Sequence, residues 1–157
     1  MALAWLPACT LRPLHAGAGG ERQEEALAAI EIDAPRTRLG QILAEALRRE
    51  LDPVGPPRPA RYLLMLRVDR DKSPLLVQLD DVTTRFDLRV ASRFDLVRKA
   101  DREVVLRGAA RRVASYNVVR APYATLVAEQ DAERRAAEEL AREIRTRLAV
   151  HFANGPP

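Results

Sequence analysis

The 157-residue chain has little of several residue types on which whole classes of protein depend. Its single cysteine, Cys9, excludes an intramolecular disulfide and any zinc site built from several cysteines. Its two histidines, His15 and His151, stand at opposite ends of the sequence, and neither has a second ligand or an orienting partner nearby. Aromatic residues make up only 4%, which is a poor supply for stacking on nucleobases. No apolar run approaches the roughly 18 residues that a membrane-spanning helix requires.

The sequence also lacks the common motifs of enzymes. It has no G-x-G-x-x-G, no phosphate-binding P-loop, no H-E-x-x-H and no G-x-S-x-G. The adjacent aspartates Asp80-Asp81 would point to opposite faces of a strand, so we interpret them as part of a polar strand or turn. We therefore predict that the protein is not an enzyme and holds no metal and no cofactor.

The residues that are present suit one folded domain with a basic middle. Apolar residues make up 47% of the chain, enough for a single modest core. The 26 basic side chains exceed the 22 acidic ones by four, and only Lys72 and Lys99 among them are lysines. Between residues 60 and 120 the excess rises to six, with 14 basic and 8 acidic side chains.

The apolar spacing predicts two amphipathic helices, one on each side of a block of strands. The first has Thr37 as its expected N-cap and an apolar stripe from Leu39 to Leu51. The second carries Pro122 in its first turn. Its expected buried stripe is Ala137, Leu140, Ala141, Ile144, Leu148 and Phe152. The pairs Asp131/Arg135, Glu138/Arg142 and Glu143/Arg147 support it as opposite charges four residues apart.

Four strands are predicted around these helices. A short one runs from Leu27 to Ile32, after a spacer at 16–20 and a polar segment at 21–25 that is either a loop or a first turn. Three longer stretches with strand-like alternation follow. They run from Tyr62 to Val68, from Phe86 to Leu96 and from Glu103 to Val118.

Local signals separate these strands along the chain. We expect a break at 72–74, a hairpin turn at 99–102, and a bulge at Gly108 that would explain the opposite parity of Val104 and Val113. The predicted fold class is α+β, with two α-helices packed on one face of a four-stranded, largely antiparallel sheet in the order β-α-β-β-β-α.

Arginine side chains give the expected sheet its candidate binding residues. Arg89 and Arg93 share one face of their strand, and Arg107 and Arg111 lie beside them on the next strand if the bulge permits. Such a row could pair with phosphates, as in a soluble adaptor that binds anionic ligands or RNA. The alternative is a solvated face with cross-strand Arg–Asp pairs. No aromatic run of the kind that RNA-recognition sheets use is present.

Two segments carry a resemblance to a known family. Leu6-Pro7-Ala8-Cys9 resembles the box at which bacterial lipoproteins are cleaved and acylated on cysteine. The tract Cys9-Thr10-Leu11-Arg12-Pro13-Leu14-His15 resembles the mature start Cys-Gly-Phe-Arg-Pro-Leu-Tyr of the LptE family, with Thr10 and His15 in place of the usual residues. Ala114-Ser115-Tyr116-Asn117-Val118, Pro122-Tyr123-Ala124 and the acidic and alanine-rich residues from Glu129 to Ile144 are similar to the alphaproteobacterial branch of that family.

The resemblance implies a function. LptE proteins are lipoproteins on the periplasmic side of the outer membrane; they plug and scaffold the LptD β-barrel and bind lipopolysaccharide. It implies a covalent lipid on Cys9, no nucleic-acid partner, and Arg12, Pro13, Leu14, Ser115, Tyr116 and Asn117 as signature residues. Arg89, Arg93, Arg107 and Arg111 become candidates for contact with lipopolysaccharide or the barrel.

The resemblance also suggests a division of the chain. We expect a partial signal peptide at 1–8, a lipidated tether at 9–25, one LptE-like domain at 26–153 and a tail at 154–157.

Overall fold

A computed structural model describes the structure of residues 18–51, 59–76 and 84–155. Within these residues the elements follow one another in the order helix, strand, helix, three strands, helix. They are α1 (Ala18–Ala28), β1 (Ile30–Asp33), α2 (Arg38–Leu51), β2 (Tyr62–Leu76), β3 (Thr84–Arg98), β4 (Val104–Val118) and α3 (Pro122–Ala153). The predicted α+β class is confirmed, and the structure adds α1 to it.

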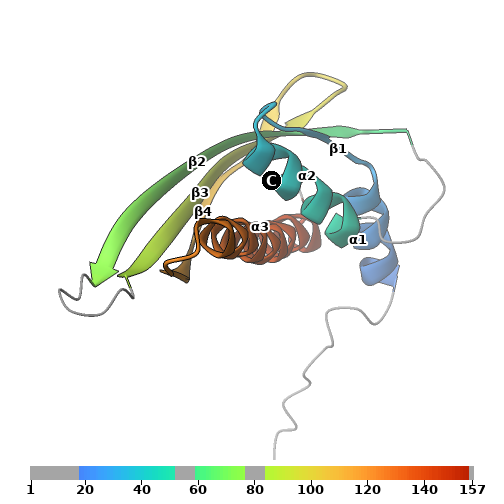
Figure 1. The fold of residues 1–157 in the computed structure, drawn as a ribbon. Helices are drawn as coiled ribbons and strands as arrows, with labels where there is room; N and C mark the ends of the chain where they lie inside the picture. Colours follow the sequence, from blue (N-terminus) through green and yellow to red (C-terminus); the bar gives the residue numbers. More distant parts are fainter. Residues whose placement is uncertain (1–17, 52–58, 77–83, 156–157) are drawn as a thin grey trace, which may run out of the picture.

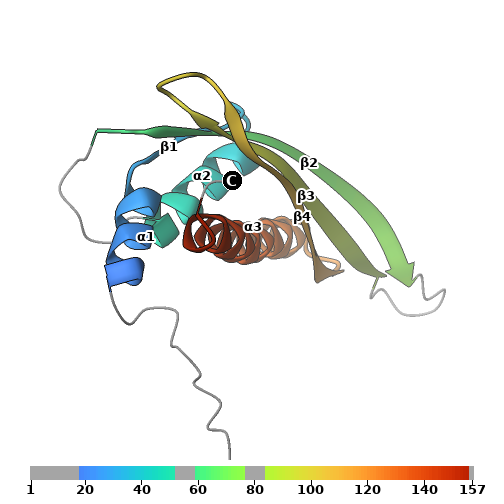
Figure 2. The same cartoon turned by 180° about the vertical axis from the view of Figure 1, so that it is seen from behind.

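The strands form one mixed sheet in the order β1-β2-β3-β4. β1 pairs with β2 in parallel, whereas β2–β3 and β3–β4 are antiparallel. The long strands curve strongly, and all three helices lie on the concave side of the sheet (Figures 1 and 2). The other side is therefore left without a covering layer in the described part of the chain.

The core lies between the sheet and the helices. Alternate residues of β3 from Leu88 to Leu96 point into it, as strand periodicity predicts. The stripe predicted for α3 meets them, with five of its six members buried and Phe152 half-buried. The largest fully buried apolar side chains are Phe94, Leu27, Leu43, Leu47, Leu64, Leu88, Leu96, Leu140, Ile144, Leu148 and Val90.

Several predicted helix and turn signals are confirmed. The Thr37 hydroxyl accepts a hydrogen bond from the amide of Gly40 at 3.1 Å and caps α2. Pro122 is the first residue of α3. The predicted turn closes the β3–β4 hairpin, where the amide of Arg98 donates to the carbonyl of Glu103 at 2.8 Å.

Two of the three predicted charge pairs on α3 form. Asp131 pairs with Arg135, and Glu143 pairs with Arg147 at 2.6 Å. Glu138 instead lies 3.9 Å from the guanidinium of Arg49 on α2.

The strand predicted over 27–32 is wrong in its first half. Residues 18–28 form α1, whose Gln23 and Leu27 are four residues apart and both buried. Only Ile30–Asp33 is a strand. Alanine-rich sequence has a high helix propensity but gives little apolar periodicity, which is why the helix was not evident.

The break predicted at 72–74 is also wrong, because β2 continues to Leu76. Beyond Met65, β2 pairs with β3 on one side only within the described residues. Pro74, which has no amide hydrogen, is tolerated at such an edge.

The bulge lies at the turn end of β4 rather than at Gly108. Leu96 pairs with Leu106 and Val97 with Val104, so Val105 is the extra residue. From Leu106 to Val118 the register is continuous, and Val113 simply faces outward with 54% of its surface exposed. Gly108 has another role, since a Cβ atom built on it would lie 2.3 Å from Cζ of Phe94.

Candidate functional site

The uncovered side of the sheet, which we call the outer face, carries the four predicted arginines. Register and alternation place Arg89, Arg93, Arg107 and Arg111 on this side, away from the helices. No bulge is needed to bring them together, because Arg111 pairs with Ala91 between Arg89 and Arg93. The outer face further includes Arg67, Asp69 and Asp71 of β2, Asp87 and Asp95 of β3, and Ser115 and Asn117 of β4.

Cross-strand ion pairs neutralise part of this face. Arg89 lies 3.6 Å from Asp71 and donates to the hydroxyl of Ser73 at 2.7 Å. Arg107 lies 3.7 Å from the carboxylate of Asp95. The guanidinium of Arg67 lies 3.5 Å from the same carboxylate. Exposed pairs of this kind contribute about 0–1 kcal/mol each, so they order the surface more than they stabilise the fold.

Two of the four arginines differ from the others. Arg93 and Arg111 form no ion pair within the described residues, and Arg93 stands directly opposite Arg67 on β2. Like charges in opposed positions are unfavourable, so this part of the face carries unneutralised positive charge. The described strands place no aromatic side chain on the outer face, which therefore offers no platform for base stacking.

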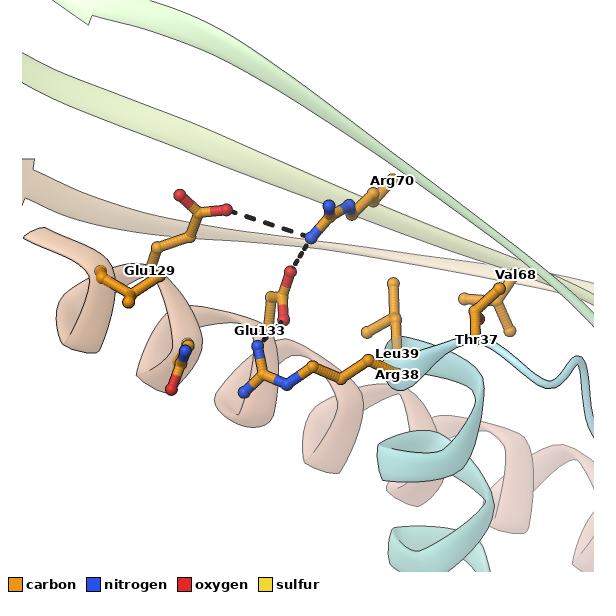
Figure 3. A pocket seen from close by; sticks show the side chains of 9 residues that line it. Thr37, Arg38, Leu39, Val68, Arg70, Glu129 and Glu133 are labelled. Carbon is orange, nitrogen blue, oxygen red and sulfur yellow. Dashed lines mark hydrogen bonds and ion pairs between the residues drawn. The ribbon is translucent and has the colours of Figure 1, made fainter.

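A second charged site, missed from the sequence, lies at the other side of the sheet. It is a crevice of about 400 Å³ between β2, the start of α2 and the first half of α3. Figure 3 shows Arg70 reaching from the sheet to Glu133 and Glu129 of α3, with Arg38 on the far side of Glu133. We call it the Glu133 crevice.

Glu133 is the buried centre of this crevice. Only 2% of its side chain is exposed, and it pairs with Arg70 and, at 3.0 Å, with Arg38. Glu129 pairs with Lys72 and accepts a hydrogen bond from the hydroxyl of Tyr116 at 3.3 Å. Burial raises the pKa of Tyr116, and the negative charge of Glu129 raises it further.

This arrangement is a closed ion-pair network rather than a reactive site. Each carboxylate is paired with a cation, and the described residues contain no group of three or more His, Cys, Asp or Glu side chains that could hold a metal ion. Glu133 could have been noticed in the sequence, since it stands four residues before Ala137 on the otherwise apolar stripe of α3.

Of the signature residues near the end of β4, Tyr116 joins the sheet to this network through Glu129. The ring of Tyr116 stacks on Phe86 with the ring centres 6.0 Å apart. The hydroxyl of Ser115 donates to Asp87 at 2.7 Å, and Asn117 is exposed on the outer face. Cys9, Arg12, Pro13, Leu14, His15 and the aspartates 80–81 lie outside the described residues.

Comparison with known proteins decides the family. The model of the lipopolysaccharide-assembly family LptE matches residues 26–148. The chain belongs to the LptE family. This family membership gives it a role in lipopolysaccharide assembly. A search of curated proteins found no match.

Solved structures agree with the LptE assignment. A Caulobacter crescentus protein described as a candidate lipoprotein is 30% identical, with a TM-score of 0.71 over 83% of this chain and 96% of its own. A minor lipoprotein from Acinetobacter baumannii is 18% identical, with a TM-score of 0.55 over 82% of this chain and 91% of its own. The rare lipoprotein B from Shewanella oneidensis is 15% identical, with a TM-score of 0.59 over 80% of this chain and 96% of its own. The last two likenesses concern the fold alone.

Among the described helices of this LptE protein, none has the length and apolar character needed to span a membrane.

Proposed function

We propose that this LptE protein is a non-enzymatic plug and scaffold of the LptD β-barrel, held at the periplasmic side of the outer membrane by a lipid on Cys9. One observation carries the barrel contact: the helices cover one side of the sheet and leave the charged outer face open. The interior of a large outer-membrane barrel is polar, so a domain enclosed by it must present charged rather than apolar side chains. The outer face has that character.

Co-purification with the barrel tests this contact. An affinity-tagged full chain should retain an LptD-type barrel, and the double variant Arg89→Glu/Arg93→Glu should retain less because it reverses two charges on the outer face. The variant Arg48→Glu/Arg49→Glu makes the same charge change on the exposed side of α2 and should retain the barrel fully. Equal recovery with the outer-face variant at physiological salt would contradict the proposal.

The lipid on Cys9 is a separate part of the proposal. Three acyl chains hold a protein firmly to a bilayer, whereas one chain gives only marginal attachment. Intact mass spectrometry of the membrane-extracted protein should show Cys9 as an acylated N-terminus. The variant Cys9→Ala, which lacks the thiol that would be acylated, should show no lipid mass in the same measurement. An unmodified Cys9 in the membrane-extracted protein would refute the anchor.

We further propose that the outer-face arginines bind lipopolysaccharide, whose lipid A carries phosphates. The unneutralised charge of Arg93 and Arg111 supports this, because guanidinium groups bind phosphate well. Replacing Arg89, Arg93, Arg107 and Arg111 with alanine should weaken lipopolysaccharide binding in a pull-down. Unaltered binding would refute the proposed lipopolysaccharide contact and would not affect the proposed barrel contact.

A further inference from the structure

We infer that the exposed start of α3 contacts the surface of a bilayer that contains anionic phospholipid. Four apolar side chains lie exposed where β4 ends and α3 begins. Their exposed fractions are 43% for Val119, 77% for Tyr123, 51% for Leu126 and 46% for Val127. We call these four residues the α3 tip. The other large apolar side chains that are exposed in the described structure lie one each on β2, β4 and the last turn of α3, so this is the one place where such side chains gather.

Helical spacing places the α3 side chains of the tip on one face of the helix. Tyr123, Leu126 and Val127 are three and four residues apart, and residues at these spacings are neighbours on a helix surface. Ala141 lies five turns after Tyr123 on the same face and is fully buried. α2 packs on this later part of α3. The apolar stripe of α3 therefore continues to the start of the helix, where no described residue covers it.

The free charges beside the α3 tip are positive. Arg120 is the one charged residue between positions 113 and 128, and Arg85 of β3 lies at the same end of the sheet, where it pairs with Asn117. Both arginines are exposed, and neither has an acidic partner within the described residues. The next carboxylates along α3, those of Glu129 and Asp131, are already paired with cations. An apolar patch with a basic margin matches the headgroup region of an anionic bilayer.

The size and residue types of the tip favour a bilayer over a protein as its partner. A stable protein interface takes about 20–30 residues on each side, far more than the four apolar residues gathered here. Reversible binding to a bilayer needs only a few apolar side chains that enter the interface and basic residues that attract anionic lipid. Tyr123, the most exposed of the four, is of a type that concentrates at the level of the headgroups.

This contact is separate from the proposed lipid on Cys9 and would act together with it. α1, which follows Cys9 in the chain, is joined to the second half of α3 by the pair of Glu24 with Arg145 at 2.9 Å. About 33 Å of helix separates Arg145 from Tyr123, at about 1.5 Å per residue. Attachment at both places would hold α3 along the membrane surface. The inference rests on the proposed function only in that the lipid brings the domain to a membrane.

Vesicle sedimentation of the full chain carrying Cys9→Ala tests the contact without an acyl chain. This parent chain should bind phosphatidylcholine vesicles that contain phosphatidylglycerol more tightly than vesicles of phosphatidylcholine alone. Tyr123→Gln/Val127→Gln should weaken binding at least tenfold and leave the thermal unfolding temperature unchanged, since both side chains are exposed. Val113→Gln/Val150→Gln removes two exposed apolar side chains elsewhere and should bind as the parent does.

A tryptophan at the tip reports the contact directly. Trp5 is the only tryptophan of the chain, so Trp5→Phe/Tyr123→Trp in the Cys9→Ala chain moves the fluorophore to the tip. Its emission should shift to shorter wavelength when vesicles with phosphatidylglycerol are added, and brominated phospholipids should quench it. An emission that vesicles leave unchanged would overturn the inference.

The sedimentation results can also contradict the inference. It is overturned if the parent chain does not bind vesicles, or if the two double variants bind them equally. A parent that ignores vesicles, together with lower barrel recovery by Tyr123→Gln/Val127→Gln, would assign the α3 tip to a protein partner instead. A wild-type chain that carries a lipid on Cys9 and retains the barrel, in the absence of these vesicle effects, would refute the tip contact alone and leave the proposed function intact.

Discussion

Gly108 lies beneath the ring of Phe94, across the pair of strands β3 and β4. A methyl group on this residue would meet Cζ of Phe94 at 2.3 Å, far inside van der Waals contact. Phe94 is almost fully buried, so its ring has little room to move aside. We expect Gly108→Ala to lower the free energy of unfolding by about 1–3 kcal/mol, as overpacking of a core does. Urea denaturation of the wild type and the variant measures this difference in the free energy of unfolding.

A double-mutant cycle separates this steric effect from a loss of backbone freedom. In a Phe94→Leu background the ring is absent, so adding Gly108→Ala should cost much less than it does in the wild type. Equal costs in the two backgrounds would show that the ring is not the reason for glycine here.

His151 near the end of α3 gives the fold a pH dependence. Burial lowers its pKa below the ordinary value of 6.5. The unfolded chain therefore binds a proton at a higher pH than the folded chain does, so this contribution to stability is complete above about pH 6.5 and is lost as the pH falls through the folded pKa. Urea denaturation at pH 7.5 and 5.5 should show this loss for the wild type and a smaller one for His151→Gln. An unchanged pH response in the variant would contradict it.

Single residues with a local role were the easiest to predict. The cap by Thr37 and the place of Pro122 depend on neighbours within one helical turn, and both are confirmed. The role of Gly108 depends on Phe94, fourteen positions earlier, and the sequence suggested a bulge instead. The outward direction of Arg89 and Arg93 follows from alternation, but which arginines lack an acidic partner depends on strand register.

At the scale of elements, the Glu133 crevice joins α3 to β2 and α2 by charge. The carboxylate of Glu133 is buried, whereas the guanidinium groups of Arg38 and Arg70 are about half exposed. Removing both arginines leaves a buried carboxylate without a cation and should lower the free energy of unfolding by about 3–5 kcal/mol. Removing the carboxylate leaves two cations that water can still solvate. This change should therefore lower the free energy of unfolding by less, about 1–2 kcal/mol.

Urea denaturation of Arg38→Gln/Arg70→Gln and of Glu133→Gln measures this asymmetry. Arg48→Gln/Arg49→Gln serves as the control for a change in net charge, since its arginines are exposed on α2. A Glu133→Gln variant less stable than the double arginine variant would show that the buried carboxylate does not govern the stability of this crevice.

Long periodic elements were predictable, and elements of mixed character were not. β3 alternates cleanly and α3 keeps an apolar stripe over many turns, so both were expected close to where they lie. α1 buries few side chains, and β2 passes through a proline. The pairs from Glu133 to Arg38 and Arg70 link residues more than sixty positions apart, and only the packing of α2 and β2 on α3 brings them together.

At the scale of the whole molecule, the sheet is protected unevenly. β3 lies between two strands along its length, whereas β2 beyond Met65 has one neighbour within the described residues. Amide hydrogen exchange should therefore be faster in residues 66–73 of β2 than in the residues 87–94 of β3 that pair with them, since alternate amides at an open edge face solvent. Equal protection of the two segments would indicate that another part of the chain covers this edge.

Within the described residues, the edge of β2 beyond Met65 and the outer edge of β4 are the places where a second copy could extend the sheet. Pro74 withholds a donor from the β2 edge, and alternating charges precede it. On β4, guanidinium groups of Arg112 and Arg135 occupy the carbonyls of Arg111 and Ser115. A second chain that extended the sheet would find one donor missing at Pro74 and two carbonyls of β4 already engaged. These features oppose fibril growth by strand addition at the edges of the described sheet.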